Sequence, residues 1–195
     1  MALITYVKVG NITNLSDARY CAAMGVSQLG FCIDKDNENY VDPATFNDIK
    51  KWIEGVDIVA ETNCTLNQAE GYAYDVLQCC YTHCANKNIQ VARQTVRFSL
   101  AQLPNINPGL LSDFEYILLE GVEEQLSTDQ KNSIREIGRK IPVVMGCGFD
   151  VHTDIPAFVD DLGLKGIALR GSREIRPGFK DYDALALILE KLEDD

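Results

Sequence analysis

Short runs of β-branched and other apolar residues alternate with amphipathic stretches from one end of this chain to the other, and this alternation restricts the fold more than any other feature. It is typical of a parallel sheet whose strands are joined by crossover helices. The predicted strands are Leu3–Val9, Gln28–Ile33, Val56–Ala60, Tyr74–Cys79, Ile89–Val96, Phe114–Leu119, Ile141–Met145 and Gly166–Leu169. Eight βα units predict a single (β/α)₈ TIM barrel over residues 1–195, with an open doubly wound sheet of fewer strands as the alternative.

Helix start signals lie between several of these strands. An Asn or Asp N-cap, a proline in the first turn and a capping box each favour a helix start. The predicted starts are Asn14, Asp42-Pro43, Ser127 with Gln130, and a last helix from about Asp181. Because a barrel of this kind usually takes about 250 residues, the middle helices, near residues 65–72, 81–87 and 99–103, are expected to be short or irregular.

Charge and hydropathy exclude several classes of partner. The formal net charge is −11, so a nucleic-acid backbone or an anionic membrane surface would be repelled on average. No apolar run approaches the roughly 20 residues that span a bilayer, and the first residues lack the features of a signal peptide. A cytoplasmic protein is expected. Its seven cysteines are then expected to be reduced thiols, mostly small core side chains.

Several segments, collinear over nearly the whole chain, carry a resemblance to a known enzyme family, and three of them illustrate it. Lys8-Val9-Gly10-Asn11-Ile12-Thr13 is similar to the Lys-Ile-Cys-Gly-Ile-Thr that ends the first strand of the phosphoribosylanthranilate isomerases. Ile117-Leu118-Leu119-Glu120 resembles their sixth strand, and Pro177-Gly178-Phe179-Lys180-Asp181 resembles the Pro-Gly-Val-Lys-Asp after their eighth. The resemblance implies a (β/α)₈ barrel of tryptophan biosynthesis. It also implies an Amadori rearrangement of an aminoaldose phosphate, in which an acid protonates the ring oxygen and a base removes the C2 proton.

The positions of that acid and base are both changed in this chain. The family's base is the cysteine of its first-strand motif, and Gly10 stands there, with no side chain to accept a proton. Glu120 replaces the family's aspartate and is the candidate general acid, and Asn39 replaces a substrate-binding arginine. Cys80 and Cys147 are candidate substitute bases near strand ends. We therefore expect the standard isomerase activity to be impaired or lost.

Small residues after the seventh and eighth predicted strands predict a phosphate site. Backbone N–H groups can approach an anion closely where side chains are small, and Arg170 and Ser172 add further donors. The predicted phosphate-binding residues are Gly146, Cys147, Gly148, Arg170, Gly171 and Ser172. A plain tight turn also needs glycine and is the alternative interpretation. The predicted partner is a phosphorylated small molecule.

Thiols and an imidazole gather after the third and fourth predicted strands, at Cys64, Cys79, Cys80, His83 and Cys84. Zinc takes four such ligands, but the spacing contains no Cys-x-x-Cys pair, so core thiols are the preferred interpretation. Neither a metal nor a cofactor is predicted. Three functions remain open: a divergent isomerase of a phosphorylated sugar, a non-catalytic binding or regulatory barrel, and a different reaction on a phosphorylated sugar.

Overall fold

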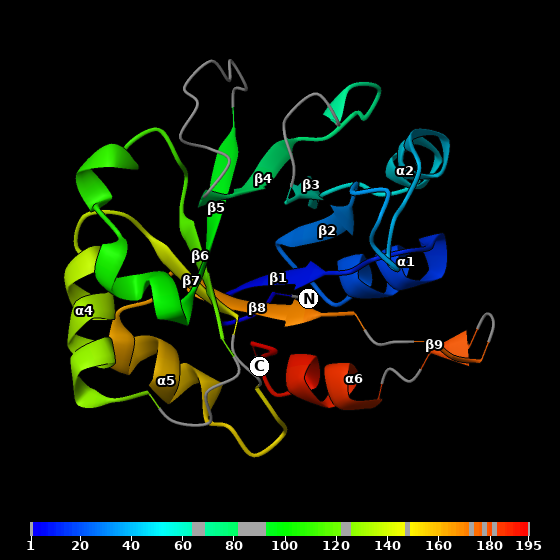
Figure 1. Ribbon diagram of the computed structural model, residues 1–195. Coiled ribbons are helices and arrows are strands. Elements are labelled where there is room, and N and C mark those ends of the chain that lie inside the picture. Colours follow the sequence, from blue (N-terminus) through cyan, green and yellow to red (C-terminus); the bar gives the residue numbers. More distant parts are fainter. Residues whose placement is uncertain are drawn as a thin grey trace.

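Eight parallel strands close into a barrel in the order in which they occur along the chain (Figure 1). They are β1 (Tyr6–Gly10), β2 (Gln28–Cys32), β3 (Asp57–Thr62), β4 (Val76–Cys80), β5 (Gln94–Ser99), β6 (Ile117–Glu120), β7 (Val143–Gly146) and β8 (Gly166–Arg170). β1 pairs with both β2 and β8, which closes the barrel and confirms the predicted fold class. The computed structural model describes residues 2–63, 69–81, 93–121, 126–146, 149–171, 174–176, 179–180 and 183–194.

The strands reach further toward their carboxyl ends than the apolar runs that predict them. β3 continues to Thr62 instead of Ala60, β5 to Ser99 instead of Val96, and β6 to Glu120 instead of Leu119. Apart from Phe98, the added residues are polar or charged, and all of them still pair with the neighbouring strand. The carboxyl-end rim of the barrel is therefore more polar than the sequence runs suggest. Residues 89–92 of the predicted fifth strand lie outside the described residues.

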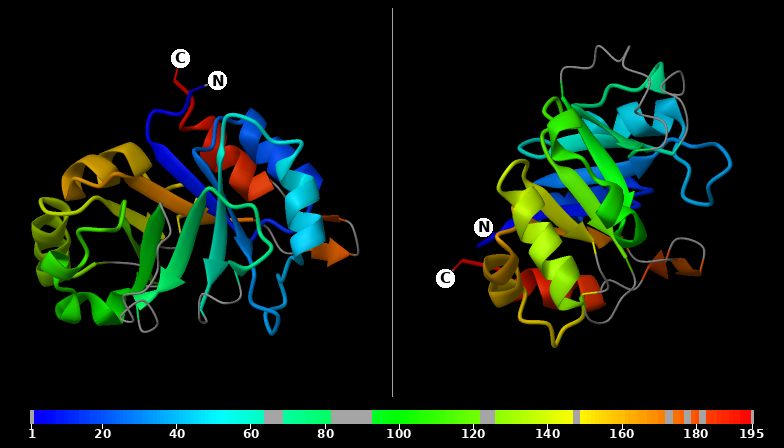
Figure 2. Two further views of the ribbon diagram at one scale, coloured as in Figure 1. Left: turned by 90° about the horizontal axis from the view of Figure 1, so that it is seen from above. Right: turned by 60° about the vertical axis from the view of Figure 1, so that its left-hand side comes forward.

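The first strand begins at Tyr6, so its predicted start at Leu3 is wrong. Leu3 forms an antiparallel bridge with Glu193, and the Ile4 N–H donates to the Leu192 carbonyl at 2.9 Å. These bonds hold the two ends of the chain side by side, as both views in Figure 2 show. The residues before Tyr6 thus pair with the carboxyl terminus instead of joining the barrel.

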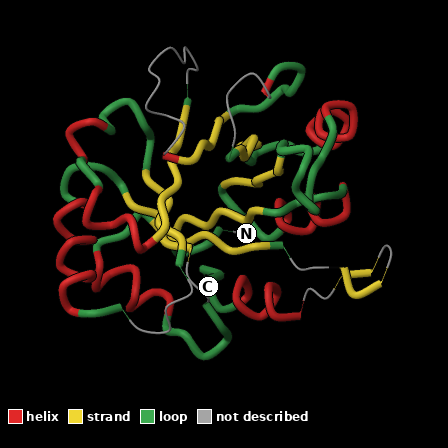
Figure 3. Tube along the Cα trace, viewed as in Figure 1, coloured by secondary structure: helices red, strands yellow, loops and turns green. Residues whose placement is uncertain are grey.

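The helices cover the outside of the barrel (Figure 3). They are α1 (Leu15–Ala23), α2 (Pro43–Lys50), α4 (Thr128–Gly138), α5 (Ile155–Leu162) and α6 (Asp183–Glu190), with 3₁₀ helices η2 (Leu100–Asn105) and η3 (Pro108–Leu110). The predicted N-caps of α1, α2 and α4 are confirmed, each side chain accepting a hydrogen bond from a backbone N–H of the first turn. η2 confirms that the middle connections are irregular. The other two predicted irregular stretches lie largely outside the described residues.

The sequence interpretation missed α5, although its signals are present. Asp154 caps the helix by accepting from the Ala157 N–H, Pro156 lies in the first turn, and Gly163 ends it with a φ of 63°. The pair β9 (Glu174–Arg176) and β10 (Phe179–Lys180) forms a separate antiparallel ribbon beyond β8. Within the described part of the chain, no helix is both long enough and apolar enough to cross a membrane.

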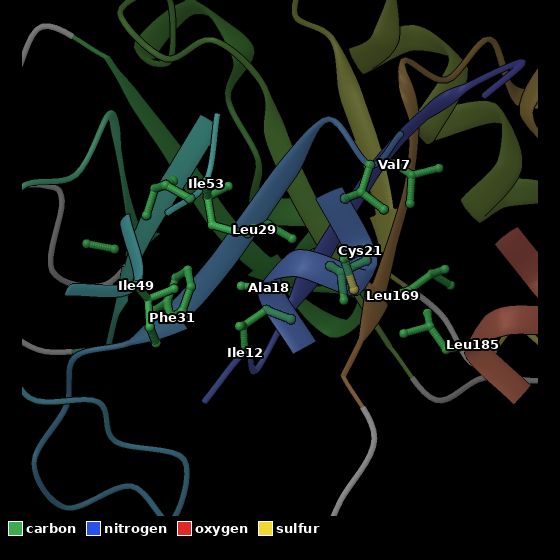
Figure 4. Close-up of a cluster of buried hydrophobic side chains, with 14 of the residues drawn as sticks. Val7, Ile12, Ala18, Cys21, Leu29, Phe31, Ile49, Ile53, Leu169 and Leu185 are labelled. Atoms are coloured by element: carbon green, nitrogen blue, oxygen red, sulfur yellow. The ribbon is translucent and has the colours of Figure 1, made fainter. Parts of the chain in front are cut away.

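The apolar core lies mainly between the outer face of the barrel and the helices. Figure 4 shows Ala18 and Cys21 of α1 among side chains from neighbouring strands, including Val7 and Leu29. A second cluster joins β5, β6 and β7 to η2 and α4. Inside the barrel, Tyr116, Leu118, Val144 and Ala168 form a small cluster of buried apolar side chains.

Polar side chains fill much of the remaining interior. Lys8, Gln28, Gln78 and Thr95 are each at most 3% exposed. At the amino end of the barrel, the Tyr116 hydroxyl donates to Gln28 Oε1 at 2.6 Å. Interiors of such barrels are usually packed with branched apolar residues. A polar interior costs free energy unless its groups are paired, so the pairing of these residues matters for both stability and function.

Candidate functional site at the carboxyl-end rim

The geometry of the strands gathers the polar residues of the rim. Side chains alternate between the two faces of each strand, so every second residue points into the barrel. Val7, Val9, Ala60, Val96 and Phe98 belong to the outer core clusters, which places their neighbours on the inner face. The residues of the inner face nearest the carboxyl ends are Gly10, Cys32, Glu61, Cys80, Arg97, Ser99, Glu120, Gly146 and Arg170. Gly10 and Glu120 therefore share one rim, as predicted.

A buried ion pair lies at the centre of this rim. The Lys8 ammonium binds Glu61 Oε1, and the two side chains are 2% and 14% exposed. Lys8 precedes Gly10 by two residues on β1, so the two residues lie on the same face of the strand. Glu61 extends toward Lys8 from β3. Burying two charges costs several kcal/mol per ion unless they are paired closely. The remaining exposure of Glu61 leaves its carboxylate open to the mouth of the barrel.

Two glycines make room for the Glu61 carboxylate. A Cβ on Gly10 would lie 3.1 Å from Glu61 Oε1 and 3.4 Å from Oε2. A Cβ on Gly30 would overlap Oε1 and stand 3.0 Å from the Lys8 ammonium nitrogen. Glu61 thus occupies the space into which a side chain at residue 10 would project. The sequence interpretation missed Glu61, because the predicted third strand ends one residue before it.

Glu120, the candidate acid, lies between two arginines. Its Oε2 is 3.4 Å from Arg97 Nη1, and its Oε1 is 3.4 Å from Arg170 Nη2. The Arg97 guanidinium also donates to Asn63 Oδ1, just beyond the end of β3. Arg97 therefore crosses the mouth from β5 to β3. Two cations and one carboxylate leave this side of the rim with a positive charge, which favours an anionic ligand.

The rim cysteines differ in their environment. Cys80 ends β4 and is partly exposed, so it stays a candidate base, whereas Cys147 lies outside the described residues. Burial raises the pKa of the Cys32 thiol to about 11, so Cys32 is a poor proton acceptor at neutral pH. Cys79 is disulfide-bonded, so the expectation of reduced thiols is wrong at this residue.

The predicted phosphate site is described only in part, because Cys147, Gly148 and Ser172 lie outside the described residues. Arg170 is 68% exposed, so its guanidinium is accessible to an anion. The Gly171 N–H donates to the Gly10 carbonyl at 2.7 Å, and a Cβ on Gly171 would approach the Asn11 carbonyl to 3.1 Å. Gly171 thus packs closely against the end of β1, and its N–H is already bonded.

The loop after β2 buries one of its three carboxylates and exposes the other two. Asp34 is buried, and its carboxylate accepts from Thr62 Oγ1 at 2.5 Å and from the Asn63 N–H at 2.7 Å. Asp36 and Glu38 are exposed, and Asn39 donates its N–H to Asn37 within the loop. Among the described residues, no group of three or more His, Cys, Asp or Glu side chains is placed to hold a metal ion. Cys64, His83 and Cys84 lie outside that part of the chain.

Comparison with solved structures identifies the architecture. Phosphoribosylanthranilate isomerase from Thermotoga maritima superimposes with a TM-score of 0.75 at 18% sequence identity, covering 96% of this chain and 98% of that one. The chain has the fold of the phosphoribosylanthranilate isomerases. The isomerase from Thermus thermophilus matches with a TM-score of 0.72 at 18% identity, covering 96% and 98% of the two chains. No family model matches the sequence, and no curated protein matches it either.

A more distant barrel also matches. Thiamine phosphate pyrophosphorylase from Pyrococcus furiosus has a TM-score of 0.57 at 16% identity, covering 97% of this chain and 96% of that one. One backbone detail agrees with the isomerase resemblance in the first strand. Asn11, which stands where that family's motif has glycine, has a φ of 58°, a conformation that asparagine tolerates better than most residues. The backbone after β1 thus turns in a way that favours glycine, although its sequence differs.

Proposed function

We propose that this chain is a divergent, cytoplasmic relative of the phosphoribosylanthranilate isomerases that binds a phosphorylated small metabolite at its carboxyl-end rim, without the standard thiol-dependent isomerisation. The observation that carries the proposal is the pair of guanidiniums, Arg97 and Arg170, on either side of Glu120 at the barrel mouth. Arginine is well suited to phosphate because its donors match two phosphate oxygens at once.

Arg170 is the residue we expect to meet the phosphate. It ends β8, where barrels of this kind often hold a phosphate group, and it is the more exposed of the two arginines. The small residues nearby, Gly146 and Gly171, leave room for an anion beside it. One solved isomerase relative carries a reduced 1-(o-carboxyphenylamino)-1-deoxyribulose 5-phosphate, a sugar phosphate, as its ligand. That relative shares 18% of its sequence with this chain.

Titration of ribose 5-phosphate by calorimetry tests this proposal. We expect binding that weakens about tenfold in Arg170→Gln, since a charge-assisted hydrogen bond contributes about 1.5–3 kcal/mol when desolvated and less at an exposed site. Arg139→Gln is the matched control, because Arg139 caps the far end of α4 at the opposite rim. Absence of heat at millimolar ribose 5-phosphate, or equal losses in both variants, contradicts the proposed site.

A different reaction on a phosphorylated sugar is favoured over a purely binding role by one observation. A partly exposed carboxylate, that of Glu61, stands in the space above Gly10 from which the family's base is missing. A purely binding barrel has no evident need for a buried charge pair there, since a pair of apolar residues would cost less to bury.

A further inference from the structure

We propose that Glu61 is the proton acceptor of this site, and that its substrate is an open-chain sugar phosphate with a carbonyl group. This inference rests on the proposed function, because it takes the phosphate end of the ligand to be held at Arg170. It adds a catalytic residue and a substrate class to that binding site.

The Glu61 carboxylate lies next to the position of the family's missing base. Glu61 Oε1 lies 3.1 Å from the Cβ position of Gly10, the residue that replaces the cysteine base of the isomerases. Gly10 pairs in register with Arg170 on β8. Neighbouring strands lie about 4.8 Å apart, so the carboxylate and the proposed phosphate contact flank the same glycine. A small molecule whose phosphate is bound by Arg170 therefore presents its carbon chain to Glu61.

The surroundings of the carboxylate hold it in place and leave a hydrogen-bond acceptor beside it for a ligand. The Lys8 ammonium fixes one edge of Glu61, and Gly30 leaves the space that the carboxylate fills. Gln78 pairs in register with Glu61 on the next strand and is 3% exposed. Its Oε1 has no hydrogen-bond partner. Buried amide oxygens nearly always have partners. An unpartnered acceptor in this interior fits a ligand hydroxyl, as a sugar supplies.

The other candidate bases are less suited. The pKa of the Cys32 thiol is raised to about 11 by burial, so it holds its proton at neutral pH. Glu120 is engaged with Arg97 and Arg170, at the side of the rim where the phosphate is expected. Cys80 ends β4, one strand further from Gly10 than Glu61 on β3. Glu61 is the carboxylate that lies beside Gly10, where the isomerases have their cysteine base.

The proposed step is an enolisation. Glu61 takes a proton from the carbon next to the carbonyl, and the C–H electron pair forms the carbon–carbon double bond of an enolate. The carbonyl π electrons move to oxygen, where the Arg97 guanidinium at the mouth offers positive charge. Returning the proton from Glu61 to the same carbon restores the substrate. If the hydroxyl proton on that carbon first moves to the enolate oxygen, the negative charge lies on the other oxygen of the enediolate. Returning the Glu61 proton to the former carbonyl carbon then forms the new carbonyl and gives the isomeric sugar phosphate. Lys8 is a positioning residue in this scheme.

The loop after β2 disfavours a substrate that carries an aryl carboxylate. Asp36 and Glu38 are exposed there, and residue 39 is asparagine where the isomerases have arginine. A ligand with a second anionic group on that side would meet negative charge. A sugar phosphate carries its charge at one end only and avoids this loop.

Solvent exchange tests the proposal with ribulose 5-phosphate, an open-chain ketose, as the probe. In D₂O we expect the full chain to catalyse the exchange of a hydrogen on a carbon beside the carbonyl of ribulose 5-phosphate for deuterium. Proton NMR follows the loss of that hydrogen's signal. Glu61→Gln should slow exchange by about 10²–10⁴-fold, the usual contribution of a positioned base. Glu61→Asp should retain intermediate activity with an altered pH profile. Glu136→Gln, which removes an exposed carboxylate on α4, should leave the rate unchanged.

Calorimetry on the same samples separates the two proposals. Binding of ribulose 5-phosphate without exchange above the buffer rate overturns the role of Glu61 and leaves the binding site intact. Exchange at the native rate in Glu61→Gln overturns it as well. No binding overturns the proposed function itself, and with it this inference.

A second measurement needs no variant, since Glu61→Gln leaves Lys8 without its counter-ion and could fail to fold. Glycidol phosphate carries a phosphate and an epoxide, and a carboxylate oxygen attacks an epoxide carbon, opening the ring to an ester and a hydroxyl that takes its proton from water. We expect one equivalent of label on the peptide that contains Glu61, with inorganic phosphate slowing the reaction. Label on another carboxylate, or none, contradicts the proposal.

Discussion

Replacing Lys8 with methionine is expected to lower the free energy of unfolding by about 3–5 kcal/mol, the usual cost of leaving one buried charge without its partner. Lys8 is 2% exposed and its ammonium binds Glu61, whose side chain is 14% exposed. Methionine has a similar length but carries no charge. The loss comes from the stranded Glu61 carboxylate more than from the missing lysine. Urea denaturation of the purified variant measures it.

Two further variants show whether burial is the cause. The double variant Lys8→Met/Glu61→Leu removes both charges, and we expect it to regain most of the lost stability. Lys50→Met is the exposed control, because Lys50 and Asp75 also form an ion pair, at 2.5 Å, but are 28% and 35% exposed. Such a pair contributes about 0–1 kcal/mol. Equal losses in Lys8→Met and Lys50→Met would show that the Lys8–Glu61 pair is not effectively buried.

The second large effect concerns the standard reaction. We expect kcat/KM for phosphoribosylanthranilate isomerisation at least about 10²-fold below that of an isomerase with its cysteine base, since a positioned base contributes about 10²–10⁴-fold. Gly10 offers no proton acceptor, and Asn39 replaces the substrate-binding arginine. The unmodified gene should therefore fail to support growth of a tryptophan auxotroph that lacks the isomerase. Robust growth would mean that another residue of the rim performs the family's proton transfer.

Restoring the family's residues requires attention to Glu61. In Gly10→Cys the new Cβ would stand 3.1 Å from Glu61 Oε1, closer than most Cβ contacts, and the thiol would extend further into the same space. The double variant Gly10→Cys/Asn39→Arg should accordingly recover little activity. Adding Glu61→Ala clears the space and leaves the thiol near the Lys8 ammonium, which favours the thiolate. The triple variant is expected to exceed the double variant in complementation.

The architecture could be predicted because the spacing of apolar residues along the sequence indicates which face of each helix or strand is buried. The eight strand positions and the N-caps at Asn14, Asp42 and Ser127 follow from local chemistry that the barrel uses directly. The resemblance of the first strand placed Gly10 at the rim, and the structure agrees. These predictions depend on interactions within one element or between neighbours, which is why a single sequence carries them.

The residues of the candidate site were harder to predict, for one physical reason. The polar ends of β3 and β5 line the mouth of the barrel, so the apolar runs stop before Glu61 and Arg97. Both residues therefore looked like loop residues in the sequence. Their inward direction follows only when the barrel closes and strand pairing fixes which side chains alternate inward. The two glycines that admit the Glu61 carboxylate are likewise recognisable only from the fold.

A crystal structure of the chain with ribulose 5-phosphate would show directly whether Glu61 meets the substrate. We expect the phosphate against the Arg170 guanidinium and a carbon next to the carbonyl within about 3–3.5 Å of a Glu61 carboxylate oxygen, the distance of a near-attack geometry. We also expect a sugar hydroxyl beside Gln78 Oε1, the buried acceptor that has no partner in the free chain. A ligand bound at the rim with its carbons turned away from Glu61, and without contact to the Lys8–Glu61 ion pair, would contradict the proposed role of Glu61.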